Sequence, residues 1–140
     1  MFENVVVGAT DSAGATRAVR RAIEVARASG GTLHIVAALG SRSRGGWGVR
    51  PDMPGRRGVR TRAGRVDSML GQLRAMATGA QVRVATHPVS AKPAEAITRV
   101  ALQEDADLIV VGTKNDRGTR QLSSVPKAVM DTAACAVLVV

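Results

Sequence analysis

Short apolar runs alternate along the chain with amphipathic segments. One of the runs, Leu108–Val111, is apolar at every position. A half-exposed strand would alternate apolar and polar residues, so this run is typical of a strand buried on both faces. Strands are predicted over Asn4–Gly8, Leu33–Leu39, Gln81–Ala85, Leu108–Val111 and Ala136–Val140.

The segments between these runs have helical periodicity, with apolar residues three or four positions apart. Helices are predicted over about Ala13–Ala28, about Arg62–Ala77, from Pro93 onward, and over about Ser124–Thr132. The order is then β-α-β-α-β-α-β-α-β. Alternation of this kind indicates a mainly parallel sheet with helices on both faces and right-handed crossovers.

Residues 40–64 interrupt the alternation with repeated glycines and two prolines, which predicts a long loop. Residues 41–65 hold eight arginines and one acid, Asp52, and so carry +7 of the formal charge of +9. Three interpretations of this arginine-rich, flexible loop remain open. It is a solvated insertion, a polybasic contact for nucleic acid, or a lid in which Trp47 covers a base.

Length and composition narrow the class of protein. A chain of 140 residues is expected to form one domain, residues 1–140, with a real core. The single cysteine, Cys135, excludes an intrachain disulfide and fits a reducing cytoplasm. No apolar run approaches the roughly 18 residues of a membrane span, and Glu3 argues against a signal peptide. We therefore expect a cytoplasmic protein.

The basic loop after Leu108–Val111 is the candidate binding site. Gly112 ends the strand, residues 114–121 are polar and basic, and Ser123 and Ser124 can cap the next helix, which has Pro126 in its first turn. A strand, a glycine, a loop and a capped helix together present backbone N–H groups and a positive helix end to an anion.

The topology brings a second segment to the same place. Ligands of open parallel sheets bind at the carboxyl ends of the strands, where the strand order reverses. If the first and fourth strands are neighbours, Ala9–Ser12 lines the crevice opposite Gly112–Ser124. The loop's cations (Lys114, Arg117 and Arg120) either neutralise phosphates or form a solvated face.

Other chemistry is poorly supported. No Ser–His–acid set or carboxylate pair can be argued for, so we expect no efficient catalyst. His34 alternates with its strand neighbours and is predicted to be a packed residue. His87 precedes Pro88 at a strand end with no Cys or carboxylate at ligand spacing, so no metal site is expected. Cys135 is expected to be a small buried hydrophobe.

Four segments carry a family resemblance: NVVVGATDSAGATRAVRRAIEVA at the start, KPAEAI, DLIVVGT, and SSVPKAVMDTAACAVLVV at the end. In this order and spacing they resemble the universal stress protein family. The resemblance implies a single three-layer α/β domain, Rossmann-like and similar to the adenine nucleotide alpha hydrolases, with a five-stranded parallel sheet in the order 3-2-1-4-5. That family dimerises through its last strand. The strand 136–140 is apolar and unprotected by charge, so a homodimer is expected.

Members of that family that bind ATP carry Gly-x-x-Gly, nine residues, and then Gly-Ser or Gly-Thr after the fourth strand. Gly112 matches the first glycine, Asn115 stands at the second, Ser123 at the third, and Ser124 matches the hydroxyl residue. Seven residues separate Asn115 from Ser123, so the loop is two shorter than the pattern. Asn tolerates a positive φ, whereas Ser123 adds a side chain where glycine lets a phosphate approach. The signature is degraded but present.

The resemblance implies further contacts. Binders place an Asp just after the first strand. An ungapped match puts Thr10 there and Asp11 one position later, and the sequence does not choose between them. Ala38 corresponds to an apolar contact with the base. The predicted ligand-binding residues are Ala9, Thr10, Asp11, Ala38, Val111, Gly112, Asn115, Arg117, Ser123, Ser124 and Val125.

The implied ligand is ATP, with or without Mg²⁺, or cyclic AMP. SSVP and the first-helix sequence are similar to actinobacterial members, some of which bind cyclic AMP, and one phosphate needs less of the phosphate loop. The expected function is an adenine-nucleotide-binding module in stress response or signalling, with slow ATP hydrolysis at most. The alternatives are a dimeric member that has lost the nucleotide, or a module that binds nucleic acid through residues 41–65.

Overall fold

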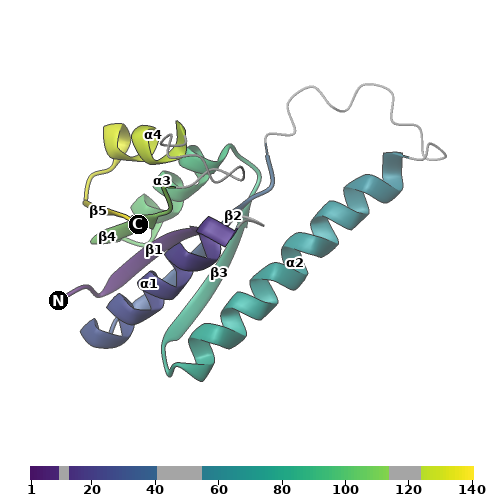
Figure 1. The fold of residues 1–140 in the computed structure, drawn as a ribbon. Helices are drawn as coiled ribbons and strands as arrows, with labels where there is room; N and C mark the ends of the chain where they lie inside the picture. Colours follow the sequence, from purple (N-terminus) through teal and green to yellow (C-terminus); the bar gives the residue numbers. More distant parts are fainter. Residues whose placement is uncertain (10–12, 41–54, 114–123) are drawn as a thin grey trace.

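The computed structural model of the protein describes residues 1–9, 13–40, 55–113 and 124–140. Strands and helices alternate along these residues as predicted (Figure 1). The elements are β1 (Asn4–Ala9), α1 (Ala13–Ser29), β2 (Thr32–Ala38), α2 (Gly55–Gly79), β3 (Arg83–Val89), α3 (Pro93–Gln103), β4 (Leu108–Val111), α4 (Ser124–Thr132) and β5 (Ala136–Val139).

The five strands form one parallel sheet in the order β3-β2-β1-β4-β5, which confirms the predicted topology. β1 lies at the centre, with Val5 beside Leu33 of β2 on one side and Leu108 of β4 on the other. The strand order reverses between β1 and β4. The carboxyl ends of these two strands therefore flank the position where sheets of this type bind ligands.

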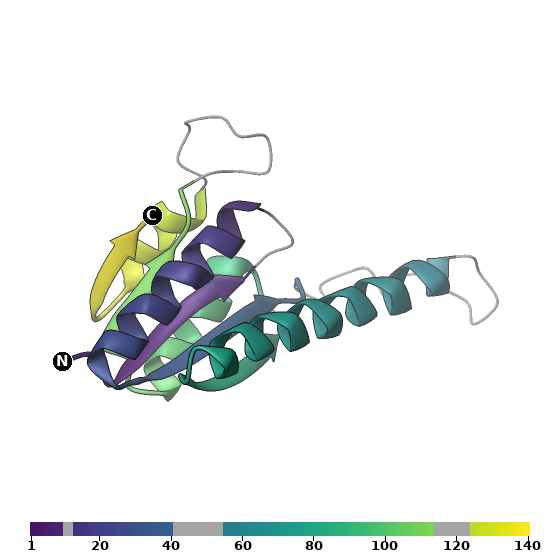
Figure 2. The same cartoon turned by 60° about the horizontal axis from the view of Figure 1, so that its bottom comes forward.

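Helices cover both faces of the sheet (Figures 1 and 2). Val5 and Val7 of β1 pack with buried residues of α1 and α2 in one core, whereas Val6 packs with buried residues of α3 and α4 in the other. All four residues of β4 are buried, as predicted for a strand covered on both faces. The buried residues of both cores are Val, Ile and Ala, and the core beneath α1 and α2 also contains Leu.

The loop predicted over residues 40–64 is wrong from Gly55 onward, because α2 begins there and not at Arg62. Its first turns extend past the sheet (Figure 2). A helical stretch with no sheet to face has no reason to carry an apolar stripe. The apolar periodicity of α2 therefore begins at Val66, which packs against the core. Before Val66 the sequence has glycines and no apolar stripe, and that pattern predicted a loop. Residues 41–54 lie outside the described residues.

The third strand is also displaced from its predicted position, Gln81–Ala85. Gln81 has a φ of 62° in the turn before the strand, and β3 runs through His87 and Pro88 to Val89. Proline lacks an N–H donor and is tolerated here because β3 is an edge strand. His87 therefore lies within a strand and not at its end. Within the described ranges, no helix has the length and apolar character needed to cross a membrane.

Candidate functional site

The carboxyl ends of β1, β2 and β4 meet at one edge of the sheet. Ala9 pairs with Ala37 of β2, and Val7 pairs with Val110 of β4. If the β1–β4 register is continued by two positions beyond Val7 and Val110, Ala9 lies beside Gly112. Ala9 is buried, and Gly112 is half-buried directly after β4. Two small residues, Ala9 and Gly112, thus lie at the position predicted for the crevice.

β5 fixes the start of the loop that follows β4. The Thr113 N–H donates to the Val140 carbonyl over 2.7 Å, and the Thr113 hydroxyl donates to the same oxygen over 2.9 Å. The Val140 N–H donates in turn to the Val111 carbonyl over 2.9 Å. Gly112 therefore lies between Val111 and Thr113, which are both hydrogen-bonded to Val140. Thr113 is not among the predicted ligand residues, although a threonine two positions after a buried strand is the signal that could have found it.

The remaining predicted residues are placed as follows. Ala38, half-buried, ends β2, and Val111, buried, ends β4. Ser124 is the exposed first residue of α4, and Val125 packs against the core beneath that helix. The first turn of α4 contains no acidic residue, so no carboxylate there offsets the positive end of the helix. Five predicted ligand residues lie outside the described residues: Thr10, Asp11, Asn115, Arg117 and Ser123.

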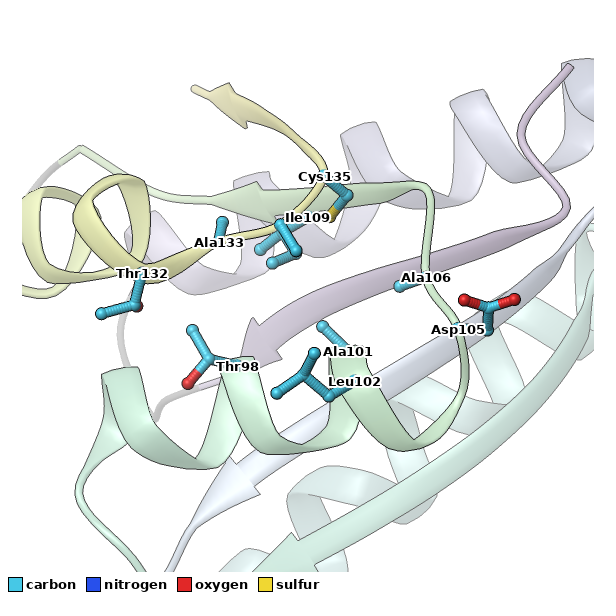
Figure 3. A pocket seen from close by; sticks show the side chains of 10 residues that line it. Thr98, Ala101, Leu102, Asp105, Ala106, Ile109, Thr132, Ala133 and Cys135 are labelled. Carbon is cyan, nitrogen blue, oxygen red and sulfur yellow. The ribbon is translucent and has the colours of Figure 1, made fainter.

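A cavity of about 120 Å³ lies elsewhere, between α3, the α4–β5 connection and the start of β4 (Figure 3). Ala101, Ile109 and Cys135 are among the residues that line it. Ligand pockets usually measure about 300–1,000 Å³, so this cavity is too small for a nucleotide. It also lies at the amino end of β4, whereas Gly112 follows the carboxyl end.

Cys135 packs against the α3 and α4 core as a small apolar residue but is only half-buried, whereas a buried position was predicted. Burial raises the pKa of its thiol, and the negative charge of Asp107 raises it further. The thiol is therefore protonated at neutral pH and is a poor nucleophile.

A pair of histidines lies on the α3 side of the sheet. His34 of β2 is 5% exposed, which confirms the predicted packed position. Its Nδ1 lies 3.0 Å from Nε2 of His87 on β3, and its Nε2 lies 3.2 Å from Oδ1 of Asn4. Burial lowers the pKa of His34, Glu104 opposes that shift, and His87 adds to it. Sequence spacing could not find this group, because its members come from β1, β2, β3 and the residue after α3.

The fold defines a class of protein: a doubly wound α/β domain, in which ligands bind at the topological switch point. The profile of the Universal stress protein family matches residues 1–140. The chain belongs to the universal stress protein family, as the sequence analysis predicted. Among curated protein sequences, none matches this chain.

Solved structures of related proteins agree. The structure titled as a universal stress protein in complex with cAMP is 30% identical, with a TM-score of 0.75, and the match covers 99% of this chain and 97% of that one. UspA from Lactobacillus plantarum is 19% identical, with a TM-score of 0.81 and coverage of 99% and 97%. The universal stress protein from Archaeoglobus fulgidus in complex with dAMP is 22% identical, with a TM-score of 0.73 and coverage of 98% and 96%.

Proposed function

We propose that this protein binds an adenine nucleotide at the carboxyl ends of β1, β2 and β4 and acts as a binding or signalling module. One observation carries the proposal: Gly112 directly follows the buried strand β4, which pairs with the central strand β1 in a register that places Gly112 at the level of Ala9. Glycine there lets a phosphate approach the backbone. Ala38 and Ala9 offer a small apolar surface to the base.

Two further observations support an adenine nucleotide. Relatives of the same fold were crystallised with cAMP and with dAMP, and the first shares 30% of its residues with this chain. Each of those ligands has one phosphate. The loop sequence between Asn115 and Ser123 is two residues shorter than the ATP-binding pattern, and one phosphate needs less of that loop. Cyclic AMP is therefore the first ligand to test, and Mg-ATP is the second. At most slow hydrolysis of ATP is expected, since the sequence offers no Ser–His–acid set or carboxylate pair.

Calorimetric titration tests the proposal. Cyclic AMP and Mg-ATP are titrated separately into the purified protein, the Gly112→Val variant and the Ser124→Ala variant. The proposal expects micromolar binding of at least one nucleotide, abolished in Gly112→Val and weakened in Ser124→Ala. Absence of heat with either nucleotide, from folded protein free of co-purified nucleotide, would make this a member that acts through protein contacts.

The proposal includes a homodimer formed through β5. β5 lies at the edge of the sheet and pairs with β4 on one side. Ala136 is exposed and Leu138 is 37% exposed. An apolar edge strand invites pairing with a second copy.

Polyanion binding remains the second candidate, favoured by the first turns of α2. Residues 55–65 carry five arginines and no acidic residue, and these turns extend past the sheet (Figure 2). Binding of this kind would weaken steeply with salt. Retention on heparin that disappears near physiological salt would exclude a specific role.

A further inference from the structure

Three potential metal ligands converge on the α3 side of the sheet, away from the nucleotide crevice. They are His34 of β2, His87 of β3 and Glu104, which follows α3. One ligand atom from each lies within 4.8 Å of the others. His34 is buried, whereas His87 and Glu104 are half-buried, so an ion could reach the group from solvent.

The distance between the histidines suits a shared metal ion. His34 Nδ1 and His87 Nε2 are 3.0 Å apart. Two imidazole nitrogens bound to one tetrahedral zinc ion at about 2.0–2.1 Å lie about 3.3 Å from each other. A small rotation of the half-buried His87 ring would open this gap. Imidazole and carboxylate together are a donor set used for zinc.

Asn4 orients the buried ring. Its Oδ1 lies 3.2 Å from His34 Nε2, so the amide oxygen accepts a hydrogen bond from that nitrogen. The neutral His34 ring then has its lone pair on Nδ1, the nitrogen that faces His87. Metal-bound histidines usually donate their other N–H to an oxygen in this way. In the metal-free pair the proton between the two rings belongs to His87 Nε2, and metal binding would move it to His87 Nδ1.

Glu104 supplies the charge. Burial lowers the pKa of His34, and the negative charge of Glu104 has a smaller, opposite effect on that pKa. Within the described ranges, the Glu104 carboxylate has no ion pair or hydrogen bond. A carboxylate that faces two imidazoles without a cation of its own is placed to bind one.

We propose that His34, His87 and Glu104 form a binding site for a divalent transition metal of the zinc type, with water completing the coordination. The site would join β2, β3 and the end of α3. It does not rest on the proposed nucleotide function, because none of its residues belongs to the crevice at Ala9, Ala38 and Gly112.

Zinc titration of the untagged full-length protein, stripped with EDTA and then freed of chelator, tests this proposal. Calorimetry is expected to give one zinc ion per chain. Affinity should fall about 10- to 100-fold in Asn4→Ala, and at least as much in His87→Ala and Glu104→Gln, which remove ligands. The matched control is Glu95→Gln, an exposed glutamate of α3 that pairs with Arg99 at 2.7 Å and should leave zinc affinity unchanged.

Cobalt gives a second readout. Co²⁺ in the same protein should show the intense visible bands of tetrahedral coordination, and His87→Ala should abolish them. The chain contains two histidines, so a signal that depends on histidine reports this pair. Absence of saturable zinc binding would overturn the proposal. So would zinc binding that survives in both folded variants, His87→Ala and Glu104→Gln, or that disappears only in Cys135→Ser.

Discussion

At Gly31 the chain passes so close to the backbone of Phe2 and Glu3, just before β1, that a side chain cannot be accommodated. A Cβ there would overlap the carbonyl oxygen of Phe2 and lie 2.9 Å from that of Glu3. Both are backbone atoms, and the Glu3 carbonyl accepts a hydrogen bond from the Thr32 N–H over 2.8 Å. We expect Gly31→Ala to lower the free energy of unfolding by about 1–3 kcal/mol, measured by urea denaturation.

Gly71 is the matched control for this substitution. It lies in α2, and a Cβ added at this position would point into open space. Alanine is the better helix former, so Gly71→Ala should raise the free energy of unfolding by about 0.5–1 kcal/mol. Equal losses of stability in the two variants would refute the close approach at Gly31.

His34 should make stability depend on pH. Burial lowers its pKa, and the groups that face it are His87 and Glu104. Between the lowered pKa and the usual value of about 6.5, the unfolded chain binds a proton that the folded chain does not. The free energy of unfolding should therefore fall as pH decreases through this window. Urea denaturation in EDTA at about pH 7.5 and about pH 5.5 measures this dependence. A His34→Gln variant with an equally steep dependence would contradict the assignment.

At the scale of elements, Asp107 joins the start of β4 to the start of β1. Its carboxylate accepts hydrogen bonds from the N–H groups of Glu3 over 2.9 Å and of Asn4 over 3.1 Å. Hydrogen bonds to a charged group are worth about 1.5–3 kcal/mol when buried, and these are partly exposed. Asp107→Ala should therefore lower the free energy of unfolding by about 1–2 kcal/mol.

An exposed aspartate of α2 provides the comparison. Asp67→Ala should change the free energy of unfolding by no more than about 0.5 kcal/mol, as for most surface substitutions. If Asp107→Ala lowers the free energy of unfolding no more than Asp67→Ala does, the two hydrogen bonds do not hold β1 to β4.

The sequence predicted most elements to within one residue, because continuous apolar runs and helical stripes reflect burial directly. β4 and α4 have their predicted bounds. The wrong predictions, the start of α2 and the bounds of β3, have a common cause. The pattern of apolar residues indicates which positions contact a core, and it does not report the backbone conformation. The first turns of α2 face no sheet and so carry no stripe. β3, at an edge, tolerates Pro88 and the polar residues around it.

The same limit applies to the sites. The position of the proposed nucleotide site could be predicted, because topology alone brings the carboxyl ends of β1 and β4 together. The anchoring of Thr113 to Val140 and the meeting of His34 with His87 and Glu104 could not. The first consists of hydrogen bonds between residues that follow β4 and β5. The second joins side chains of β2, β3 and the residue after α3, so sequence spacing indicates neither.

At the scale of the whole molecule, the proposed homodimer predicts a change in mass. Leu138→Lys places a charge on the exposed side chain of the edge strand, so light scattering after size exclusion should give a monomer. Leu102, which is 72% exposed on α3, provides the control, and Leu102→Lys should leave the mass unchanged. A monomeric parent protein, or a dimer that survives Leu138→Lys, would place the interface elsewhere or remove it.

The proposed binding of an adenine nucleotide at the carboxyl ends of β1, β2 and β4 can be tested residue by residue. Amide chemical-shift mapping of the ¹⁵N-labelled protein, titrated with cyclic AMP and then with Mg-ATP, tests it most directly. We expect saturable changes in amide chemical shift that centre on Ala9, Ala38 and Gly112, with no change at Ala85 and His87. Shifts that centre on the cavity around Ala101 and Cys135, or no shifts with either nucleotide, would contradict it.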